Sequence, residues 1–237
     1  MNITWVEIGD CRLACGDALE ILPTLEAGSV DCVVTDPPYG IGYKSGMTGH
    51  DGGTSLPGII GDDDTSMRDA ALKWWGDGPA IVFGSWKVSK PVGCKIVLTW
   101  DKGDHVGMGD LSMPWKPNTE EVYVLSGGFS GHRGSSVLRY NAPVTWNSVG
   151  FGRTHPHEKP VALMDALICK CPSGTIADPF MGSGTTGVAC IRTGRKFVGI
   201  ELDPGYFDIA CKRIEDEYKR LALFEEPPKR KTQQSLI

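Results

Sequence analysis

The sequence predicts an α/β fold in which a mostly parallel β-sheet carries helices on both faces. Short apolar runs bounded by Gly, Pro and Asp alternate with segments of helical period, which is the pattern of βαβ units. The 237-residue chain is 41% hydrophobic and 22% charged, an ordinary globular balance. No apolar run approaches the roughly 20 residues that a membrane span needs.

The short apolar runs are interpreted as strands because a strand covered on both faces is continuously apolar. Helical spacing marks Val161–Cys171, which follows Pro160 at a helix-start position, and Gly205–Leu223. The segment after Thr175–Ala177 is expected to open a further helix. The candidate strands are Ile3–Ile8, Arg12–Cys15, Val30–Thr35, Ala80–Phe83, Lys95–Trp100, Glu121–Leu125, Thr175–Ala177 and Lys196–Ile200.

Two segments break this alternation. Residues 40–61 are rich in Gly, Asp and Ser and predict a long mobile loop, and residues 126–154 show only weak periodicity. The charged tail over residues 225–237 is expected to be disordered. Residues 1–224 are therefore expected to form a single domain.

Composition narrows the function classes. The eight cysteines include no CxxC pair, so free thiols are expected, with no metal site. The formal net charge of −5 argues against a uniformly basic nucleic-acid-binding surface, although a cleft needs only a local positive patch. The N-terminus lacks the basic and apolar regions of a signal peptide, so a cytoplasmic protein that does not bind membranes is expected.

A stiff polar tetrapeptide, Asp36-Pro37-Pro38-Tyr39, directly follows the candidate strand Val30–Thr35. Ligands bind beyond the carboxyl ends of strands in open α/β sheets, and the two prolines fix the backbone there. A carboxylate, a carbonyl and an aromatic ring held in this way suit an exocyclic amino group on a base rotated out of its stack. The alternative is a proline-rich turn with an Asp cap and a packing Tyr.

A glycine motif, Asp178 to Gly187, follows the candidate strand Thr175–Ala177. Glycines let a ligand approach the backbone closely, and Glu201 after the next strand suits a ribose. The same letters satisfy the G-x-G-x-x-G pattern of dinucleotide-dependent oxidoreductases. That pattern normally opens its fold, whereas only one strand follows it here. A carboxylate at Asp178 also suits the ammonium of a methionine better than a pyrophosphate.

With these motifs in this order, the chain resembles the amino-methyltransferases of DNA over about Leu13 to Arg213. It is similar to the beta group, in which the catalytic tetrapeptide precedes the cofactor motif. The segments that carry the resemblance are Val30–Gly40, the His155–Pro160 segment HPHEKP, Ile176–Gly187 and Phe197–Asp203. The resemblance implies a Rossmann-like methyltransferase fold with a seven-stranded sheet and a circularly permuted motif order.

The resemblance also implies roles for particular residues. Asp17 would contact the adenine of S-adenosyl-L-methionine (AdoMet), Glu201 its ribose, and His155 and Lys159 its methionine end. Plain turn, capping or surface roles are the alternatives for Asp17, His155 and Lys159. The implied catalytic residues are Asp36, Pro37, Pro38 and Tyr39, and the implied cofactor-binding residues are Asp17, Asp36, His155, Lys159, Asp178, Pro179, Phe180, Gly182, Ser183, Gly184, Thr185, Thr186, Glu201, Leu202 and Asp203.

The implied reaction is transfer of the AdoMet methyl group to N6 of an adenine flipped out of double-stranded DNA. Relatives with Asp before Pro-Pro-Tyr mostly methylate adenine, and those with Ser mostly methylate cytosine N4, which stays the alternative. Target recognition would fall within residues 126–154, a short window, with help from residues 40–61. The candidate DNA contacts are Arg133 and Arg139, with Lys44 and His50 as weaker ones; ordinary solvated charges are the alternative for each.

Further expectations follow from the same resemblance. A homodimer and a cognate restriction endonuclease are expected partners, as in a restriction-modification system. RNA or protein amide methyltransferases are competing classes, although they usually have Asn in the place of Asp36. A catalytically silent relative is disfavoured because Asp36, Tyr39 and the cofactor glycines are all present.

Overall fold

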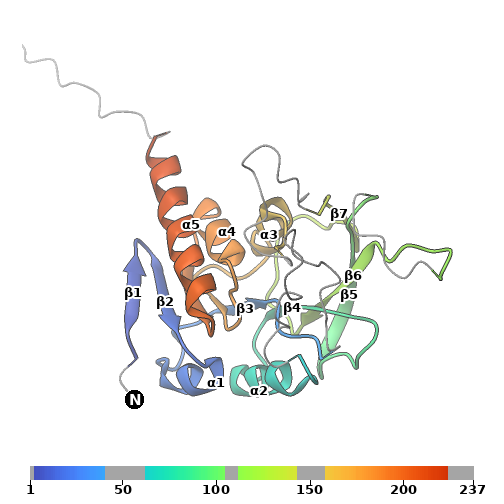
Figure 1. Cartoon of the computed structure of the whole chain (residues 1–237), viewed down its shortest axis with the longest axis horizontal. Helices are drawn as coiled ribbons and strands as arrows, with labels where there is room; N and C mark the ends of the chain where they lie inside the picture. The colour runs from blue at the N-terminus through green and yellow to red at the C-terminus, as the bar shows by residue number, and fades with distance from the viewer. Residues whose placement is uncertain (1–2, 41–61, 105–111, 143–157, 224–237) are drawn as a thin grey trace, which may run out of the picture.

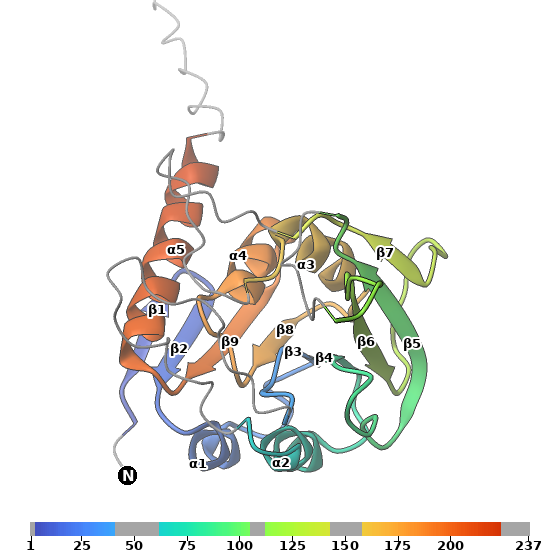
Figure 2. The ribbon, with the colours of Figure 1, turned by 45° about the vertical axis from the view of Figure 1, so that its right-hand side comes forward.

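The computed structural model describes residues 3–40, 62–104, 112–142 and 158–223. Within these residues one mixed sheet has the strand order β1-β2-β9-β8-β3-β4-β6-β5-β7 (Figure 2). The strands are β1 (Trp5–Ile8), β2 (Cys11–Cys15), β3 (Cys32–Thr35), β4 (Ala80–Gly84), β5 (Cys94–Asp101), β6 (Thr119–Leu125), β7 (Val137–Arg139), β8 (Thr175–Asp178) and β9 (Lys196–Glu201).

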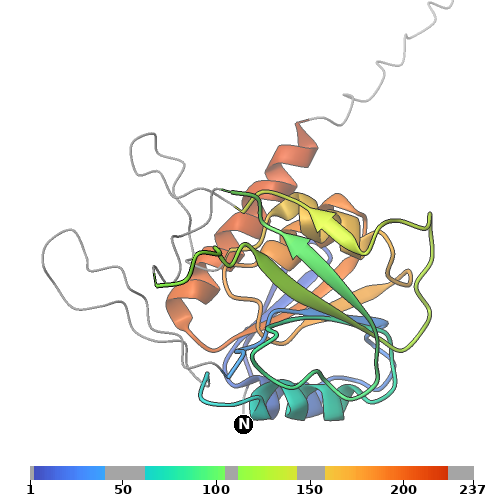
Figure 3. The ribbon, with the colours of Figure 1, turned by 90° about the vertical axis from the view of Figure 1, so that its right-hand side faces the viewer.

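Helices cover both faces of this sheet (Figures 1 and 3). On one face α3, α4 and α5 pack in a core that contains Leu163, Val188 and Ile214. On the other face α1 and α2 pack through a core that contains Ile21 and Ala71. The α-helices are α1 (Ala18–Ile21), α2 (Ser66–Trp75), α3 (Val161–Ile168), α4 (Thr185–Arg192) and α5 (Pro204–Ala222), and a 3-10 turn spans Leu22–Thr24.

The central strands run parallel and end at a common edge. β2, β9, β8, β3 and β4 pair in parallel, so the residues that follow each of them gather at that edge. β6 is antiparallel to β4 and β5, and its first residues therefore lie at the same edge. The continuous burial of β3 and β4 agrees with their β-branched and apolar sequences.

The predicted α/β class and mostly parallel sheet are confirmed, but the seven-strand expectation is wrong. All eight apolar runs form strands, and β7 adds a ninth among the described residues. β7 was missed because its three residues lie in a Gly- and Ser-rich segment with no period of its own. It becomes a strand by pairing in parallel with the edge of β5, where Thr99 lies opposite Val137.

Other expectations differ in detail or fall outside the described residues. The helix expected over Val161–Cys171 ends at Ile168, and α1 and α2 were not predicted. Four cysteines are buried, whereas Cys15 and Cys169 are exposed. Residues 41–61 and the tail after residue 223 lie outside the described part. No helix among the described residues is long and apolar enough to cross a membrane.

The hairpin of β1 and β2 is tied to α5 through its two-residue turn. Gly9 has a φ of +56°, and a Cβ built there would lie 2.4 Å from the ring of Tyr218. The Tyr218 hydroxyl accepts a hydrogen bond of 2.7 Å from the Asp10 amide. Glycine is therefore required here both by backbone conformation and by packing.

Gly9→Ala is expected to lower the free energy of unfolding by about 3 kcal/mol, from left-handed strain together with overpacking against Tyr218. Gly28→Ala is a matched control, because Gly28 has a φ of +77° with nothing within 4 Å of a built Cβ. That control should lose only about 1 kcal/mol. Equal losses in urea denaturation would contradict the packing of the turn on Tyr218.

Candidate active site

The pairing of β3 with β8 brings the two sequence motifs together. Cys32 lies opposite Ile176 and Val33 opposite Ala177, so the strands end side by side. The Thr35 hydroxyl donates a 2.7 Å hydrogen bond to Oδ1 of Asp178, across 143 positions of sequence. The tetrapeptide that begins at Asp36 and the glycine motif that begins at Asp178 are therefore neighbours.

The Asp178 carboxylate lies beneath the glycine motif and is 2% exposed. Oδ1 also accepts from the Phe180 amide at 3.1 Å, and Oδ2 accepts from the Thr186 hydroxyl at 2.6 Å. Burial raises the pKa of this carboxyl to about 6, although the hydrogen bonds oppose the rise. The expected contact with a cofactor ammonium stays a prediction. The geometry itself gives Asp178 the role of holding the loop to the end of β8.

The loop after β8 depends on two glycines with positive φ, Gly182 at +53° and Gly184 at +79°. A Cβ built on Gly184 would lie 2.9 Å from the Cβ of Ala210, so α5 packs directly on this glycine. A Cβ built on Gly182 meets nothing within 4 Å. The loop is closed on its α5 side and open above Gly182, where a ligand can approach the backbone.

Arg213 on α5 fastens the same loop. One guanidinium nitrogen donates to the Ser183 carbonyl at 2.8 Å and to the Ser183 hydroxyl at 2.7 Å. The other donates to Glu158 at 2.6 Å. Arg213 thus joins the loop to the segment before α3, and sequence reasoning did not find it because its partners lie 30 and 55 positions away.

The carboxylate of Glu201, at the end of β9, also holds the loop. It accepts from the Gly182 amide at 2.9 Å and from the Asp203 amide at 2.8 Å. Burial raises its pKa. The Asp203 carboxylate caps α5 by accepting from the Tyr206 amide at 2.9 Å, and Leu202 is 42% exposed.

A pocket of about 270 Å³ opens where β2 ends, between β1, α1 and α5. Gly16, Asp17 and Phe207 are among its lining residues. The Gly16 amide donates to the Glu201 carbonyl at 2.9 Å, so the pocket adjoins the Glu201 strand end. Oδ1 of Asp17 accepts from the Leu19 amide at 2.8 Å, which makes Asp17 the cap of α1 as well as a pocket residue.

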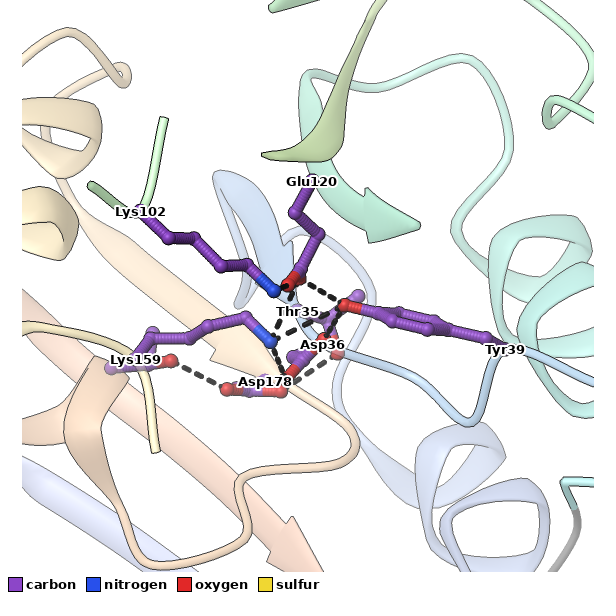
Figure 4. A network of polar contacts seen from close by, with 8 residues as sticks. Thr35, Asp36, Tyr39, Lys102, Glu120, Lys159 and Asp178 are labelled. Carbon is purple, nitrogen blue, oxygen red and sulfur yellow. Dashed lines mark hydrogen bonds and ion pairs between the residues drawn. The ribbon is translucent and has the colours of Figure 1, made fainter. Parts of the chain in front are cut away.

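At the tetrapeptide, four charged side chains and one tyrosine form a single polar cluster (Figure 4). The Tyr39 hydroxyl lies 2.6 Å from Oδ1 of Asp36 and also contacts Oε1 of Glu120. The Lys159 ammonium lies 2.5 Å from Oδ2 of Asp36 and 3.0 Å from Oε1 of Glu120. Lys102 binds Oε2 of Glu120 at 2.6 Å. The two ammonium groups balance the two carboxylates.

Lys159 is the most enclosed charge of this cluster. Its side chain is 8% exposed, and its ammonium lies 4.9 Å from the centre of the Phe83 ring and 5.9 Å from that of Trp100. Burial acts to lower the pKa of Lys159, but the Asp36 and Glu120 carboxylates outweigh it and raise that pKa. Lys159 is therefore a fixed ammonium.

Glu120 and Tyr39 owe their proton states to the same surroundings. Burial acts to raise the pKa of Glu120, but the ammonium groups of Lys159 and Lys102 outweigh it and lower that pKa well below its ordinary value. Burial and the two nearby carboxylates raise the pKa of Tyr39 well above 10. The cluster thus holds an ionised Glu120 and a neutral phenol. Asp36, with a side chain 27% exposed, is its most open carboxylate.

Sequence reasoning placed Asp36 and Tyr39 together but missed Glu120 and Lys102. Glu120 lies at the start of β6, and Lys102 directly follows β5. The signal that could have found them is a charged residue at the end of a strand whose other residues enter the core. Lys159 was expected near the cofactor's methionine end, and the structure places it against Asp36. In the tetrapeptide Pro37 is buried and Pro38 half-buried; in the glycine loop Pro179, Thr185 and Thr186 are buried and Phe180 is half-buried.

The candidate DNA contacts are only partly described. Arg139 ends β7, is 74% exposed and lies 3.9 Å from Asp101, and Arg133 is exposed. These positions are compatible with solvated charges and with nucleic-acid contacts. Lys44, His50 and His155 lie outside the described residues.

Asp178→Asn is expected to change how stability depends on pH. The folded pKa of about 6 exceeds the ordinary value of 3.8, so the native state binds this proton more tightly. Its stabilising contribution is present below about pH 4 and is lost as the pH rises through 6. The difference in unfolding free energy, wild type minus variant, should fall by on the order of 3 kcal/mol between pH 4 and 7. A difference in urea denaturation that is constant over this range would contradict it.

Solved structures with the same architecture include DNA methyltransferases. A crystal structure of an M1.HpyAVI–SAM complex matches with a TM-score of 0.58 at 23% identity, covering 86% of this chain and 99% of that chain. PvuII DNA methyltransferase, described as cytosine-N4-specific, matches with a TM-score of 0.64 at 18% identity, covering 91% and 93%. At these identities the likeness shows the fold, and the expected Rossmann-like methyltransferase fold is confirmed.

Sequence comparison gives the family. The type II methyltransferase M.Cfr9I of Citrobacter freundii is 27% identical over a gapped alignment of 273 residues. The alignment covers 90% of this chain and 90% of that protein. A family model described as DNA methylase matches residues 85–212, more than half of the chain. That match spans Glu120, Lys159 and the whole glycine loop. The chain belongs to the DNA methylase family.

Proposed function

We propose that the chain transfers the methyl group of AdoMet to the exocyclic N6 of an adenine flipped out of duplex DNA. The observation that carries this proposal is the junction of β3 and β8, where Thr35 binds Asp178. It puts the carboxylate of Asp36 beside the loop that is open above Gly182. An acceptor for an amino group and a cradle for a cofactor therefore share one edge of the sheet.

The cofactor is AdoMet, whose sulfonium supplies the methyl group without a metal ion. The open backbone at Gly182 and the pocket beside Asp17 fit such a ligand on one continuous edge, since Gly16 and Gly182 both bind Glu201. We assign the ribose to the Glu201 end of this edge and the adenine to the pocket at Asp17. The loop over residues 178–186 would hold the methionine end.

The tetrapeptide supplies the groups that the acceptor base needs. Hydrogen bonds from the amino group to the Asp36 carboxylate and the Pro37 carbonyl would favour a pyramidal nitrogen, whose lone pair can point at the methyl donor. The Lys159 ammonium holds one oxygen of Asp36 at 2.5 Å, and Asp36 would accept a hydrogen bond from the amino group without removing a proton first. Catalysis would rest on positioning and on hydrogen bonds aimed at developing charge. Tyr39 would stack on the flipped base.

Adenine is proposed over cytosine because Asp, and not Ser, precedes Pro-Pro-Tyr. Cytosine N4 is the alternative, and the PvuII structure shows that this fold also serves a cytosine-specific enzyme. Both bases present an exocyclic amino group, so the same Asp36 and Pro37 acceptors suit either one.

The wider setting is also part of the proposal. Residues 1–224 would be one catalytic domain, with the target recognised by residues 126–154 and 40–61. The relationship to type II methyltransferases supports a place in a restriction-modification system with a cognate endonuclease. A homodimer is proposed for the protein in solution.

The test is transfer from labelled AdoMet to unmethylated duplex DNA, with nucleoside analysis of the product. Wild type should yield N6-methyladenine, and Asp36→Ala should lower the rate by about a thousandfold because the amino group loses its acceptor. Asp77→Ala is the control, since it removes an exposed carboxylate before β4, at the opposite edge of the sheet. N4-methylcytosine would overturn the adenine assignment, and an undiminished Asp36→Ala rate would overturn the role of Asp36.

The negative net charge of the chain also predicts how DNA binding responds to salt. With a net charge of −5, binding would depend on a local cluster of Lys and Arg at one cleft. Each phosphate neutralised contributes to a linear fall of log affinity with log salt. DNA affinity should therefore drop steeply between low and physiological salt in a fluorescence anisotropy titration. An affinity that hardly changes would contradict phosphate contacts as its main source.

A further inference from the structure

We propose that Glu120 is a positioning residue for methyl transfer, which takes over the hydroxyl of Tyr39 from Asp36 when the target amino group arrives. The inference rests on the proposed function and adds a residue to it. It concerns any exocyclic amino group and so holds for adenine and cytosine alike.

The first step is the hydrogen count at Tyr39. A phenol carries a single hydrogen to donate, and the Tyr39 hydroxyl lies within hydrogen-bond distance of Asp36 and Glu120 together (Figure 4). Only one carboxylate can receive that hydrogen at a time. Because Oδ1 of Asp36 and Oε1 of Glu120 both already contact the hydroxyl, its O–H bond can turn from one acceptor to the other with little movement of the ring.

The second step is the occupation of Asp36. Its Oδ1 faces the Tyr39 hydroxyl and its Oδ2 faces Lys159, so each oxygen has a donor before any substrate is present. A carboxylate oxygen can accept two hydrogen bonds, so an amino group displaces the Tyr39 hydroxyl where it approaches the lone pair of Oδ1 that this hydroxyl occupies. A buried hydroxyl left without an acceptor costs about 1–3 kcal/mol, which would oppose base binding.

The third step is that Glu120 removes this cost. Once the substrate N–H binds Oδ1 of Asp36, the Tyr39 hydroxyl can donate to Oε1 of Glu120, where it already lies. Every donor then keeps an acceptor. Lys102 holds the other oxygen of Glu120 at 2.6 Å, and Lys159 lies 3.0 Å from Oε1. These contacts fix Glu120 in place, so Tyr39 remains anchored and its ring keeps its orientation.

The neighbouring residue on β6 offers a matched control. Glu121 also accepts a tyrosine hydroxyl, that of Tyr123 at 2.6 Å. Successive residues of a strand point to opposite faces of the sheet, so Glu121 lies away from the cluster. Glu121→Gln thus removes the same charge and weakens a similar hydrogen bond on the same strand.

The experiment is single-turnover methyl transfer to duplex DNA by wild type, Glu120→Gln, Glu121→Gln, Tyr39→Phe and the double variant Glu120→Gln/Tyr39→Phe, with AdoMet affinity measured in parallel. Glu120→Gln should lower the rate about 30-fold, since the amide is a weaker acceptor for the phenol. AdoMet affinity and the Glu121→Gln rate should each stay within about twofold of wild type.

The double variant separates a handover from a structural role. In the Tyr39→Phe background there is no hydroxyl to transfer, so adding Glu120→Gln should lower the rate by no more than about threefold. An equal loss in both backgrounds would overturn the inference, because Glu120 would then act without Tyr39. Equal rates for Glu120→Gln and Glu121→Gln would overturn it too. Wild type that methylates no DNA would overturn the proposed function, a result distinct from either.

Discussion

The parallel pairing of β3 with β8 is the constraint on which the site depends. The two motifs are separated by most of the chain, and each alone is a stiff turn or a glycine loop. Strand pairing sets Thr35 against Asp178, where both residues are 2% exposed and their hydrogen bond is shielded from solvent. Because an unpaired carboxylate there would be costly, the bond also fixes how the loop leaves β8. The tetrapeptide and the glycine loop are thereby held in one relative position.

The balance of buried charges at the start of β6 is the second requirement of the site. Lys159 is buried against aromatic rings, and an isolated ammonium there would be strongly destabilised. Asp36, Glu120 and Lys102 balance it, and the four charges come from three different regions of the sequence. One consequence is that Asp36 is held by Lys159 and is still 27% exposed.

The order of the two motifs in the sequence is made possible by the way the N-terminal hairpin joins the sheet. β9, the last strand, pairs with β2, so the N-terminal hairpin completes the sheet beside the glycine loop. α5 then packs on that loop through Ala210 and Arg213 and on the hairpin turn through Tyr218. Helix α5 therefore links the N-terminal hairpin to the glycine loop.

The sequence by itself determined eight of the nine described strands, since buried strands are continuously apolar. It also located Asp36, Tyr39 and the glycine loop, since these follow strand ends. Tertiary structure alone decided which of these side chains contact one another. Whether Lys159 meets a cofactor or Asp36, and whether Glu120 joins the site, depends on strand order, which local pattern does not encode. β7 shows the same limit, because its pairing comes from the free edge of β5 and not from its own residues. The period of the apolar residues indicates which side chains are buried. The contacts of charged side chains depend on which distant elements the fold brings together.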